Sequence, residues 1–480
     1  MNRLLTAALI FNTLAVVLNA QSPNPQSPNP QSPNPQFPIP TPAQLAWHDT
    51  EFYLFFHFGP NTFTNLEWGH GTEPEDLFNP TDLDCDQWCR IAKQAGARGV
   101  VITAKHHDGF CLWPSKYSTH TVRESKWRNG QGDVLRELAD ACKRHGLKLG
   151  FYLSPWDRNH PQYGTPEYND VYVNTLTELL TGYGDLFEIW WDGANGEGPN
   201  GKKQVYDFHR FEKVAAKLQP DAVIFSDIGP GCRWAGNERG LILTETNWCT
   251  LDTVGFQRGL GAPPEDTLNQ GNVNGALWLP AECDVSIRPG WFYHSEEDDK
   301  VKTPEQLWEI YMKSVGRGAN LILNVPPDRR GRIHEQDSAA LVGFGKKVKA
   351  AFDKNLAEGK PCCLGNGKHW FDAGMTDGSA KTFAEFDLVP AESFFEINLK
   401  RKKTINAVII REKLENSGQR IQAFKIEIPE KNGWREIARS TTVGARKILT
   451  FPEVKTRKVR ITVLAAKAPP ILSEVQIFRI

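Results

Sequence analysis

The sequence predicts an α/β fold, in which a (β/α)8-type barrel is followed by a C-terminal antiparallel β-sandwich. Short apolar segments alternate with amphipathic helical segments across residues 41–355, as βα units around a parallel sheet do. Several of the apolar segments end in histidine or aspartate, and the carboxyl ends of barrel strands form the active-site face. Helical periodicity is nearly absent from residues 356–480, where short alternating segments separated by turns indicate a sandwich.

The N-terminal residues 1–20 predict a secretory signal peptide, because an early arginine precedes an apolar stretch and a small-residue ending. A membrane anchor is the alternative for this segment. No later segment contains the roughly 18 uninterrupted apolar residues that a spanning helix needs. We therefore expect no membrane span and a protein that is secreted or otherwise exported, to the extracellular space, cell wall, periplasm, vacuole or lysosome. Residues 21–40 contain three copies of Gln-Ser-Pro-Asn-Pro, which favour an extended Pro-rich linker.

Within the barrel, we expect strands at 53–59, 99–105, 147–154, 187–192, 222–227, 241–246 and 319–325. Helices are expected at 85–97, 133–146, 168–184 and 208–219, with a final helix near 335–355. The strands are nearly continuous in apolar residues, as strands buried on both faces should be. A doubly wound open sheet is the competing architecture, but the number of strands and the lack of a Gly-x-Gly-x-x-Gly turn after the first favour the barrel. The sandwich strands are expected at 383–389, 394–400, 405–412, 421–429, 446–451, 458–464 and 474–480.

The balance of charge argues against nucleic acid or a membrane surface as the partner. The 56 lysines and arginines nearly cancel the 57 aspartates and glutamates, so no broad electrostatic field attracts a polyanion. Aromatic residues make up 11% of the chain and include 15 tryptophans, an abundance that suits sugar faces or core filling. The nine cysteines fit an oxidising compartment, and their odd number leaves at least one free if the rest pair within the chain. The oligomeric state is left open.

Two acidic residues follow the pattern of a retaining glycosidase. Asp192 ends the apolar strand FEIWWD, and glycines at 193, 196 and 198 open the loop after it. A retaining glycosidase needs a second carboxyl group about 5 to 5.5 Å from the first, and Glu238 in the Gly-rich segment 228–240 is the candidate. The alternatives are a helix cap or loop brace for Asp192 and a solvated loop acid for Glu238.

Histidines and aromatic residues supply the parts of a sugar pocket. His106 and His107 directly follow the expected strand at 99–105, and two imidazoles at a strand end can bind adjacent hydroxyls. With Asp108 they are also three potential metal ligands, but three consecutive residues rarely converge on one ion, and we expect no metal or cofactor. The remaining candidates for hydroxyl and ring contacts are His57, Glu67, Trp190, Trp191 and the run GWFYH at 290–294.

Six segments together resemble the α-L-fucosidases of glycoside hydrolase family 29: HFGPNTFTNLEWG, TAKHHDGFCLWPS, GFYLSPWDRN, EIWWDGANGEG, RWAGNERG and PAECDVSIRPGWFYH. The resemblance covers roughly residues 45–355. The Arg-Trp-x-Gly-Asn-Glu loop resembles the plant-type branch, subfamily B, which prefers α-1,3 and α-1,4 fucosyl linkages. The resemblance implies a retaining, exo-acting enzyme that works by double displacement, with Asp192 as the nucleophile and Glu238 as the acid/base.

The resemblance also implies the sugar-binding residues. Four residues match family positions that bind fucose hydroxyls: His57, Glu67, His106 and His107. Trp190 matches a tryptophan near the sugar, and Arg233 matches an arginine that approaches the catalytic acids. A family tyrosine aligns at Tyr152 or at Leu153, and Trp291 contacts either fucose or the group to which fucose is attached.

Other functions compete with this expectation. A catalytically silent fucose-binding lectin on the same barrel is one, although both expected carboxylates are present. A metal-dependent hydrolase that uses His106, His107 and Asp108 is the other. The expected partner is a fucosylated oligosaccharide or glycoprotein glycan, and the C-terminal sandwich is either a sugar-binding module or a structural buttress.

Overall fold

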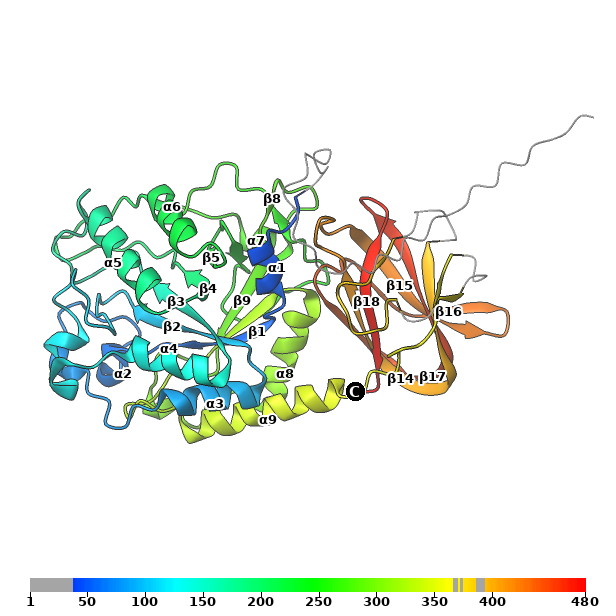
Figure 1. Cartoon of the computed structure of the whole chain (residues 1–480), viewed down its shortest axis with the longest axis horizontal. Coiled ribbons are helices and arrows are strands. Elements are labelled where there is room, and N and C mark those ends of the chain that lie inside the picture. Colours follow the sequence, from blue (N-terminus) through cyan, green and yellow to red (C-terminus); the bar gives the residue numbers. More distant parts are fainter. Residues whose placement is uncertain (1–37, 366–369, 372–373, 386–392) are drawn as a thin grey trace, which may run out of the picture.

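The computed structural model describes residues 38–365, 370–371, 374–385 and 393–480, which form two domains (Figure 1). The expected signal peptide, and the expected linker apart from its last three residues, lie outside this part of the chain. Among the described residues, no helix is both long and apolar enough to cross a lipid bilayer.

Eight parallel strands close into a barrel in the spatial order β1-β10-β9-β6-β5-β4-β3-β2, which confirms the expected fold class. The strands are β1 Phe52–Phe56, β2 Gly99–Lys105, β3 Lys148–Leu153, β4 Leu186–Trp190, β5 Val223–Ser226, β6 Cys232–Trp234, β9 Ala281–Ser286 and β10 Asn320–Asn324. A separate two-stranded sheet consists of β7 Thr250–Leu251 and β8 Leu277–Trp278.

Helices cover the outside of the barrel (Figure 1). They are α1 Pro42–His48, α2 Pro60–Thr64, α3 Cys85–Ala95, α4 Val134–His145, α5 Tyr168–Gly182, α6 Phe208–Leu218, α7 Glu265–Gln270, α8 Pro304–Lys313 and α9 Glu335–Phe352. Short 3-10 helices lie at Glu75–Leu77, Val122–Glu124, Trp127–Gly130, Ser295–Glu297 and Val315–Arg317. Local sequence sets the helix ends: the Asp84 side chain caps the N-terminus of α3, and Gly96 ends that helix in the left-handed conformation.

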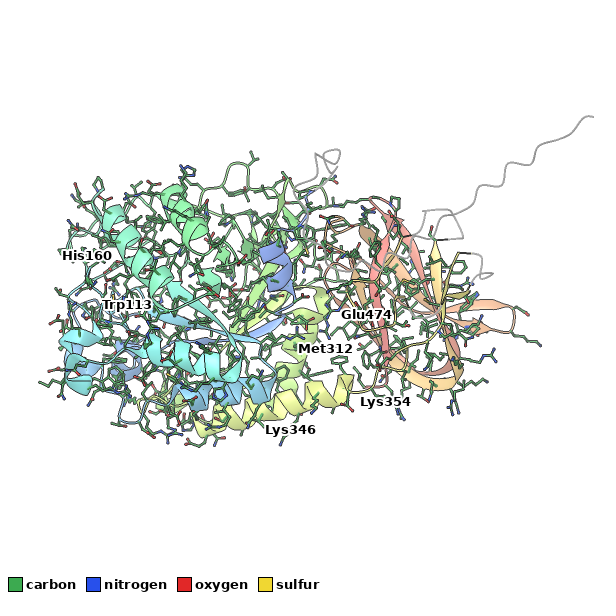
Figure 2. The ribbon with its side chains drawn as sticks, viewed as in Figure 1. Trp113, His160, Met312, Lys346, Lys354 and Glu474 are labelled. Carbon is green, nitrogen blue, oxygen red and sulfur yellow. The ribbon has the colours of Figure 1, made fainter. Side chains whose placement is uncertain are left out.

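The barrel strands are apolar because both of their faces are buried. Alternate residues such as Phe55, Val101, Trp190 and Phe225 fill the barrel interior. The residues between them pack outward onto the helices in a second, larger core. Side chains fill these layers in both domains, and Met312 of α8 lies on the side of the barrel that faces the second domain (Figure 2).

The expected strand at 241–246 is wrong, because this segment is irregular and buries Ile242 against the outside of the barrel. The barrel uses β6 and β9 instead. β6 has only three residues, so it leaves little periodicity in the sequence. β9 carries Glu282 and Asp284, two buried acids that mask its strand pattern.

The C-terminal domain is an antiparallel sandwich, as expected, built on β14 Phe394–Glu412, β15 Ile421–Glu430, β16 Gly433–Ser440, β17 Lys447–Ala466 and β18 Ile471–Phe478. Shorter strands are β11 Cys362–Leu364, β12 Trp370–Phe371 and β13 Ala384–Glu385. The long strands β14 and β17 each absorb two expected segments, with shifts in their pairing register. The expected strand at 383–389 lies partly outside the described residues. The domain has its own apolar core, which includes Phe395, Phe424 and Val475.

Ion pairs join the two domains beside β1. The buried carboxylate of Glu51 contacts Arg411 at 2.5 Å and Arg446 at 2.6 Å, both from the sandwich. Burial alone would raise the pKa of Glu51, but the guanidinium groups of Arg446 and Arg411 lower it to about 2. The domains are therefore held together by a charged contact as well as by apolar packing.

Candidate active site

The carboxyl ends of β1 to β4 bring five of the expected site residues to one mouth of the barrel. His57 follows β1, His106 and His107 follow β2, and Tyr152 lies near the end of β3. The ring centroids of His57 and His106 are 5.8 Å apart, and those of His106 and Tyr152 are 5.7 Å apart. Asp192 follows β4, and it completes a compact group of polar side chains.

Hydrogen bonds fix the carboxylate of Asp192. The Tyr152 hydroxyl donates to Oδ2 at 3.1 Å, and the backbone N–H of Ala194 donates to Oδ1 at 2.8 Å. The Asp192 side chain is 27% exposed, so a ligand can reach it. The next residue must be small, because a Cβ at Gly193 would lie 2.2 Å from Oδ2 of Asp227. The rigid strand and the glycine together hold the carboxylate at the mouth with open space around it.

The hydrogen bonds of His57 fix its tautomer. The amide group of Asn324 donates from Nδ2 to the Ser286 hydroxyl at 2.9 Å and to the Trp291 carbonyl at 2.7 Å. Its Oδ1 therefore accepts from His57 Nδ1, which lies 2.8 Å away. Burial lowers the pKa of His57 to about 3, so the ring is neutral and Nε2 is an acceptor.

His107 has a similar arrangement. The Ser154 hydroxyl donates to the carbonyl of Trp156 at 2.8 Å, so it accepts from His107 Nδ1 at 2.7 Å. His107 Nε2 lies 3.7 Å from Oδ2 of Asp192. Burial lowers the pKa of His107 to about 4, although the charge of Asp192 opposes that shift. Two neutral imidazoles thus offer acceptor nitrogens beside the carboxylate.

The buried ring of His106 lies between these two histidines, within the aromatic group at the mouth. Its Nδ1 is buried without a hydrogen-bond partner among the described residues. Burial holds its pKa well below the ordinary value, so this ring too is neutral.

Glu67 fastens the loop at 290–294 over the mouth. Its carboxylate accepts from the backbone N–H groups of Trp291 at 2.8 Å and Phe292 at 3.2 Å, and it contacts Nε2 of His294 at 2.6 Å. The indole N–H of Trp291 in turn donates to Oε2 of Glu238 at 3.3 Å. Trp291 therefore joins the side of the mouth that carries the histidines to the exposed acid that follows β6.

Two expected residues lie below or outside the mouth. Trp190 points into the barrel, where its indole N–H donates to Glu282 at 2.8 Å and its ring stacks on Phe225 at 4.0 Å. It also stacks on Tyr152, so it supports that ring from below. The structure contradicts the expectation that Arg233 approaches the catalytic acids. This residue is fully buried on the outer face of β6, with its Nε donating to the carbonyl of Leu268 at 2.6 Å.

Two further acids near the mouth were not among the expected site residues. Asp227 follows β5 beside Asp192, and burial and the charge of Asp192 raise its pKa to about 6. Asp284 accepts from the indole N–H of Trp234 at 2.7 Å, and burial keeps its pKa well above the ordinary value. The strand-end position of Asp227 was a visible signal, whereas Asp284 lies in the strand that the sequence pattern did not reveal.

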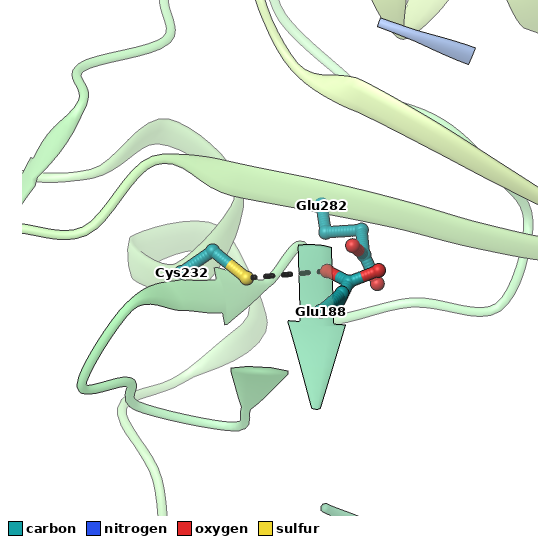
Figure 3. Close-up of side chains that lie close together, drawn as sticks. All are labelled: Glu188, Cys232 and Glu282. Carbon is teal, nitrogen blue, oxygen red and sulfur yellow. Dashed lines mark hydrogen bonds between the residues drawn. The ribbon is translucent and has the colours of Figure 1, made fainter. Parts of the chain in front are cut away.

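Within the described residues, one group has the composition of a metal site, and it lies inside the barrel. Ligand atoms of Glu188, Cys232 and Glu282 lie within 4.8 Å of one another (Figure 3). Indole N–H groups already bond both carboxyl groups, from Trp47 to Glu188 at 3.0 Å and from Trp190 to Glu282. Burial and the charge of Glu282 raise the pKa of Glu188 well above the ordinary value. These contacts fit two acids that share one proton better than they fit a cation.

Comparisons with known proteins identify the family of this chain. A family model described as alpha-L-fucosidase matches residues 61–351, and a model for the NedA-like, galactose-binding domain matches residues 374–461. Alpha-L-fucosidase 1 of Arabidopsis thaliana is 42% identical, over 91% of this chain and 86% of its own length. The structure of a glycoside hydrolase 29 family member from a rumen bacterium has a TM-score of 0.80 at 39% identity, over 93% of this chain and 78% of that one.

A third comparison involves a ligand. The Ruminococcus gnavus GH29 fucosidase in complex with fucose has a TM-score of 0.82 at 29% identity, over 94% of this chain and 97% of that one. The matches cover both domains, and the alpha-L-fucosidase model alone spans more than half of the chain. The chain belongs to the α-L-fucosidases of glycoside hydrolase family 29.

Proposed function

We propose that this α-L-fucosidase is an exo-acting, retaining enzyme that removes α-1,3- and α-1,4-linked L-fucose from oligosaccharides or glycoprotein glycans. The observation that carries the proposal is the Asp192 carboxylate at the end of β4, held by Tyr152 and the Ala194 N–H and faced by neutral imidazoles. Glu238 is the second acid, on the loop that follows β6 and beside the Trp291 indole. Fixed donors keep the nucleophile oriented while leaving it accessible.

The reaction takes two displacements. Asp192 attacks the anomeric carbon, and the bond to the leaving oxygen breaks as Glu238 gives that oxygen a proton. Glu238 then removes a proton from a water molecule, which attacks the same carbon and releases Asp192. Each step inverts the carbon, so fucose leaves with its original α configuration.

Neutral histidines bind the sugar in this proposal. The Nε2 atoms of His57 and His107 accept hydrogen bonds from fucose hydroxyls, and His106 supplies a further contact. Trp291 covers the sugar from the side of the acid/base, and with Phe292 it forms an apolar wall for the methyl group of fucose. The burial of the histidines strengthens their hydrogen bonds to the sugar, because water does not compete for the same nitrogen atoms.

The preferred linkage and the location are further parts of the proposal. The segment Arg233–Glu238 resembles the plant-type branch of the family, which supports cleavage of α-1,3 and α-1,4 linkages. Residues 1–20 have the composition of a signal peptide, which supports export of the enzyme.

A paired hydrolysis assay tests the reaction and the linkage. The purified protein is given an α-1,3/1,4-fucosylated Lewis oligosaccharide and, separately, an α-1,2-fucosylated one, and NMR follows the first anomer released. We expect α-fucose from the Lewis substrate alone. Initial release of β-fucose would refute retention, and release from the α-1,2 substrate would refute the linkage preference.

A pair of variants tests the nucleophile. Asp192→Ala should lower kcat by at least about 10⁴-fold while the melting temperature stays near that of the wild type. Asp221→Asn is the matched control, since this exposed acid precedes β5 at the opposite end of the barrel. Appreciable turnover by Asp192→Ala would assign the nucleophile to another residue.

A further inference from the structure

We propose that the C-terminal sandwich positions the acid/base, by clamping the chain segment that carries Glu238 from outside the barrel. The inference rests on the proposed role of Glu238. Residues 235–249 link β6 to β7 without a helix or strand of their own. Isolated backbone bonds hold Ala235, Ile242 and Trp248. The position of Glu238 therefore depends on these bonds and on side-chain bonds to the segment rather than on a continuous ladder.

One anchor of the segment lies within the barrel domain. Asn269 of α7 is buried, and its Nδ2 donates to the carbonyls of Ala235 at 3.0 Å and Leu241 at 2.9 Å. Its Oδ1 accepts from the N–H of Leu243 at 2.6 Å. The amide of Asn237 donates to the same two carbonyls, at 3.4 and 3.1 Å, so two amides close the chain around Glu238 into a loop whose two ends are held together.

The second anchor comes from the sandwich. Gln419 donates from Nε2 to the carbonyl of Asn247 at 2.9 Å and accepts at Oε1 from the N–H of Cys249 at 2.7 Å. The hydroxyl oxygen of Thr442 accepts from the N–H of Asn247 at 2.8 Å. Gln419 and Thr442 are each 1% exposed, so no water replaces these bonds if they are lost. The N–H and carbonyl of Asn247 and the N–H of Cys249 therefore have hydrogen-bond partners in the second domain.

Arg233 ties this anchor to the strand at which the loop begins. Its Nη2 donates to Oδ1 of Asn247 at 3.3 Å, and its Nε donates to the carbonyl of Leu268 in α7. Burial lowers the pKa of Arg233 to about 10, so the side chain remains a cation at neutral pH. The next residue, Trp234, bonds Asp284 inside the barrel. Arg233 is thus a positioning residue, which links the contact with the sandwich to β6.

Ionic contacts surround the same anchor. The carboxylate of Glu245 accepts from Arg317 at 2.8 Å and from the Ser440 hydroxyl at 3.1 Å, and the buried Lys447 lies 3.4 Å from it. Ser440 and Lys447 both belong to the sandwich. One part of the contact between the domains, separate from the Glu51 ion pairs, therefore falls on the segment that follows Glu238, which is where a brace for the acid/base has to act.

Leaving-group dependence tests the inference, because general acid assistance matters most when the leaving group is poor. Gln419→Met and Thr442→Val keep the buried shapes and remove the polar partners. Both variants should lose about ten-fold in kcat/KM on aryl fucosides with poor leaving groups, and less than about two-fold on activated ones. Thr442→Ser keeps the hydroxyl group and should behave as the wild type. The pair of Thr442 variants therefore tests the inference even if Gln419→Met fails to fold.

The matched control is Thr456→Val, because the bonds of this buried hydroxyl group to Lys458 lie within the sandwich. It should lower the melting temperature without changing the leaving-group dependence. Suppose that Glu238→Ala shows the dependence of rate on the leaving group. Equal losses on all substrates for the Gln419 and Thr442 variants, or no loss, would then overturn the proposed bracing by the sandwich. If Glu238→Ala itself lacks that dependence, the role of Glu238 fails and the inference fails with it.

Discussion

Replacement of Asp227 by asparagine should stabilise the enzyme above pH 6 and not below pH 4. Asp227 lies beside Asp192, and burial and the charge of Asp192 raise its pKa from 3.8 to about 6. The folded state then holds a proton that the unfolded state releases, so the wild type loses stability as pH rises from about 4 to about 6. About two pH units at 1.36 kcal/mol per unit amount to about 3 kcal/mol. The loss is complete above about pH 6.

Thermal and urea unfolding of the wild type and Asp227→Asn between pH 4 and pH 8 measure this effect. The quantity to compare is how the difference in unfolding free energy between variant and wild type changes with pH. The effect of the amide group itself does not depend on pH, so it cancels. The advantage of the variant should grow by up to about 3 kcal/mol between pH 4 and pH 7. Asp221→Asn, at the far end of the barrel, is the control. A difference between Asp227→Asn and wild type that does not vary with pH would refute the raised pKa of Asp227.

Three further changes test the contacts around the site. Tyr152→Phe removes a hydrogen bond to the Asp192 carboxyl group worth about 1.5 to 3 kcal/mol, so kcat/KM should fall about 10- to 100-fold if Asp192 acts as proposed, and an unchanged rate would remove Tyr152 from the mechanism. Asp337→Ala leaves the buried Arg288 with Asp298 as its remaining carboxylate partner, and denaturant unfolding should show a loss of about 3 kcal/mol, the low end for a broken buried pair. Treatment with EDTA should leave the rate of fucose release unchanged, and a loss restored by added metal would instead favour a metal-dependent hydrolase.

The sequence pattern identified the barrel strands that carry an apolar run, and it missed β6, which is short, and β9, in which Glu282 and Asp284 interrupt the run. The expected bounds of β2, residues 99–105, match the observed ones at both ends, because all seven residues of this strand are buried. β9 was missed because acids from this strand point into the barrel, where Glu282 and Glu188 meet beside Cys232. Burial of a charged pair depends on partners from distant strands, and a single sequence does not show them.

The site was predictable where a residue ends a long strand. His57, His106 and Asp192 each follow an apolar run, and the barrel brings such positions to one mouth. Arg233 was assigned to the site from its match to a family arginine, and the structure instead buries it outside the barrel. Side chains alternate along a strand, so Cys232 turns into the barrel while Arg233 turns out of it.

The burial of His57 and the amide of Asn324 together define how this ring responds to acid: burial lowers its pKa, and the amide sets its tautomer. The amide fixes the proton of His57 on Nδ1, and the low pKa of this ring, about 3, keeps Nε2 bare from neutral to mildly acidic solution. In the proposed binding mode, Nε2 of His57 therefore accepts a fucose hydroxyl equally well at neutral and at mildly acidic pH. The pH optimum of the enzyme is then a property of its carboxyl groups, and it should appear in kcat while the affinity for free fucose stays flat.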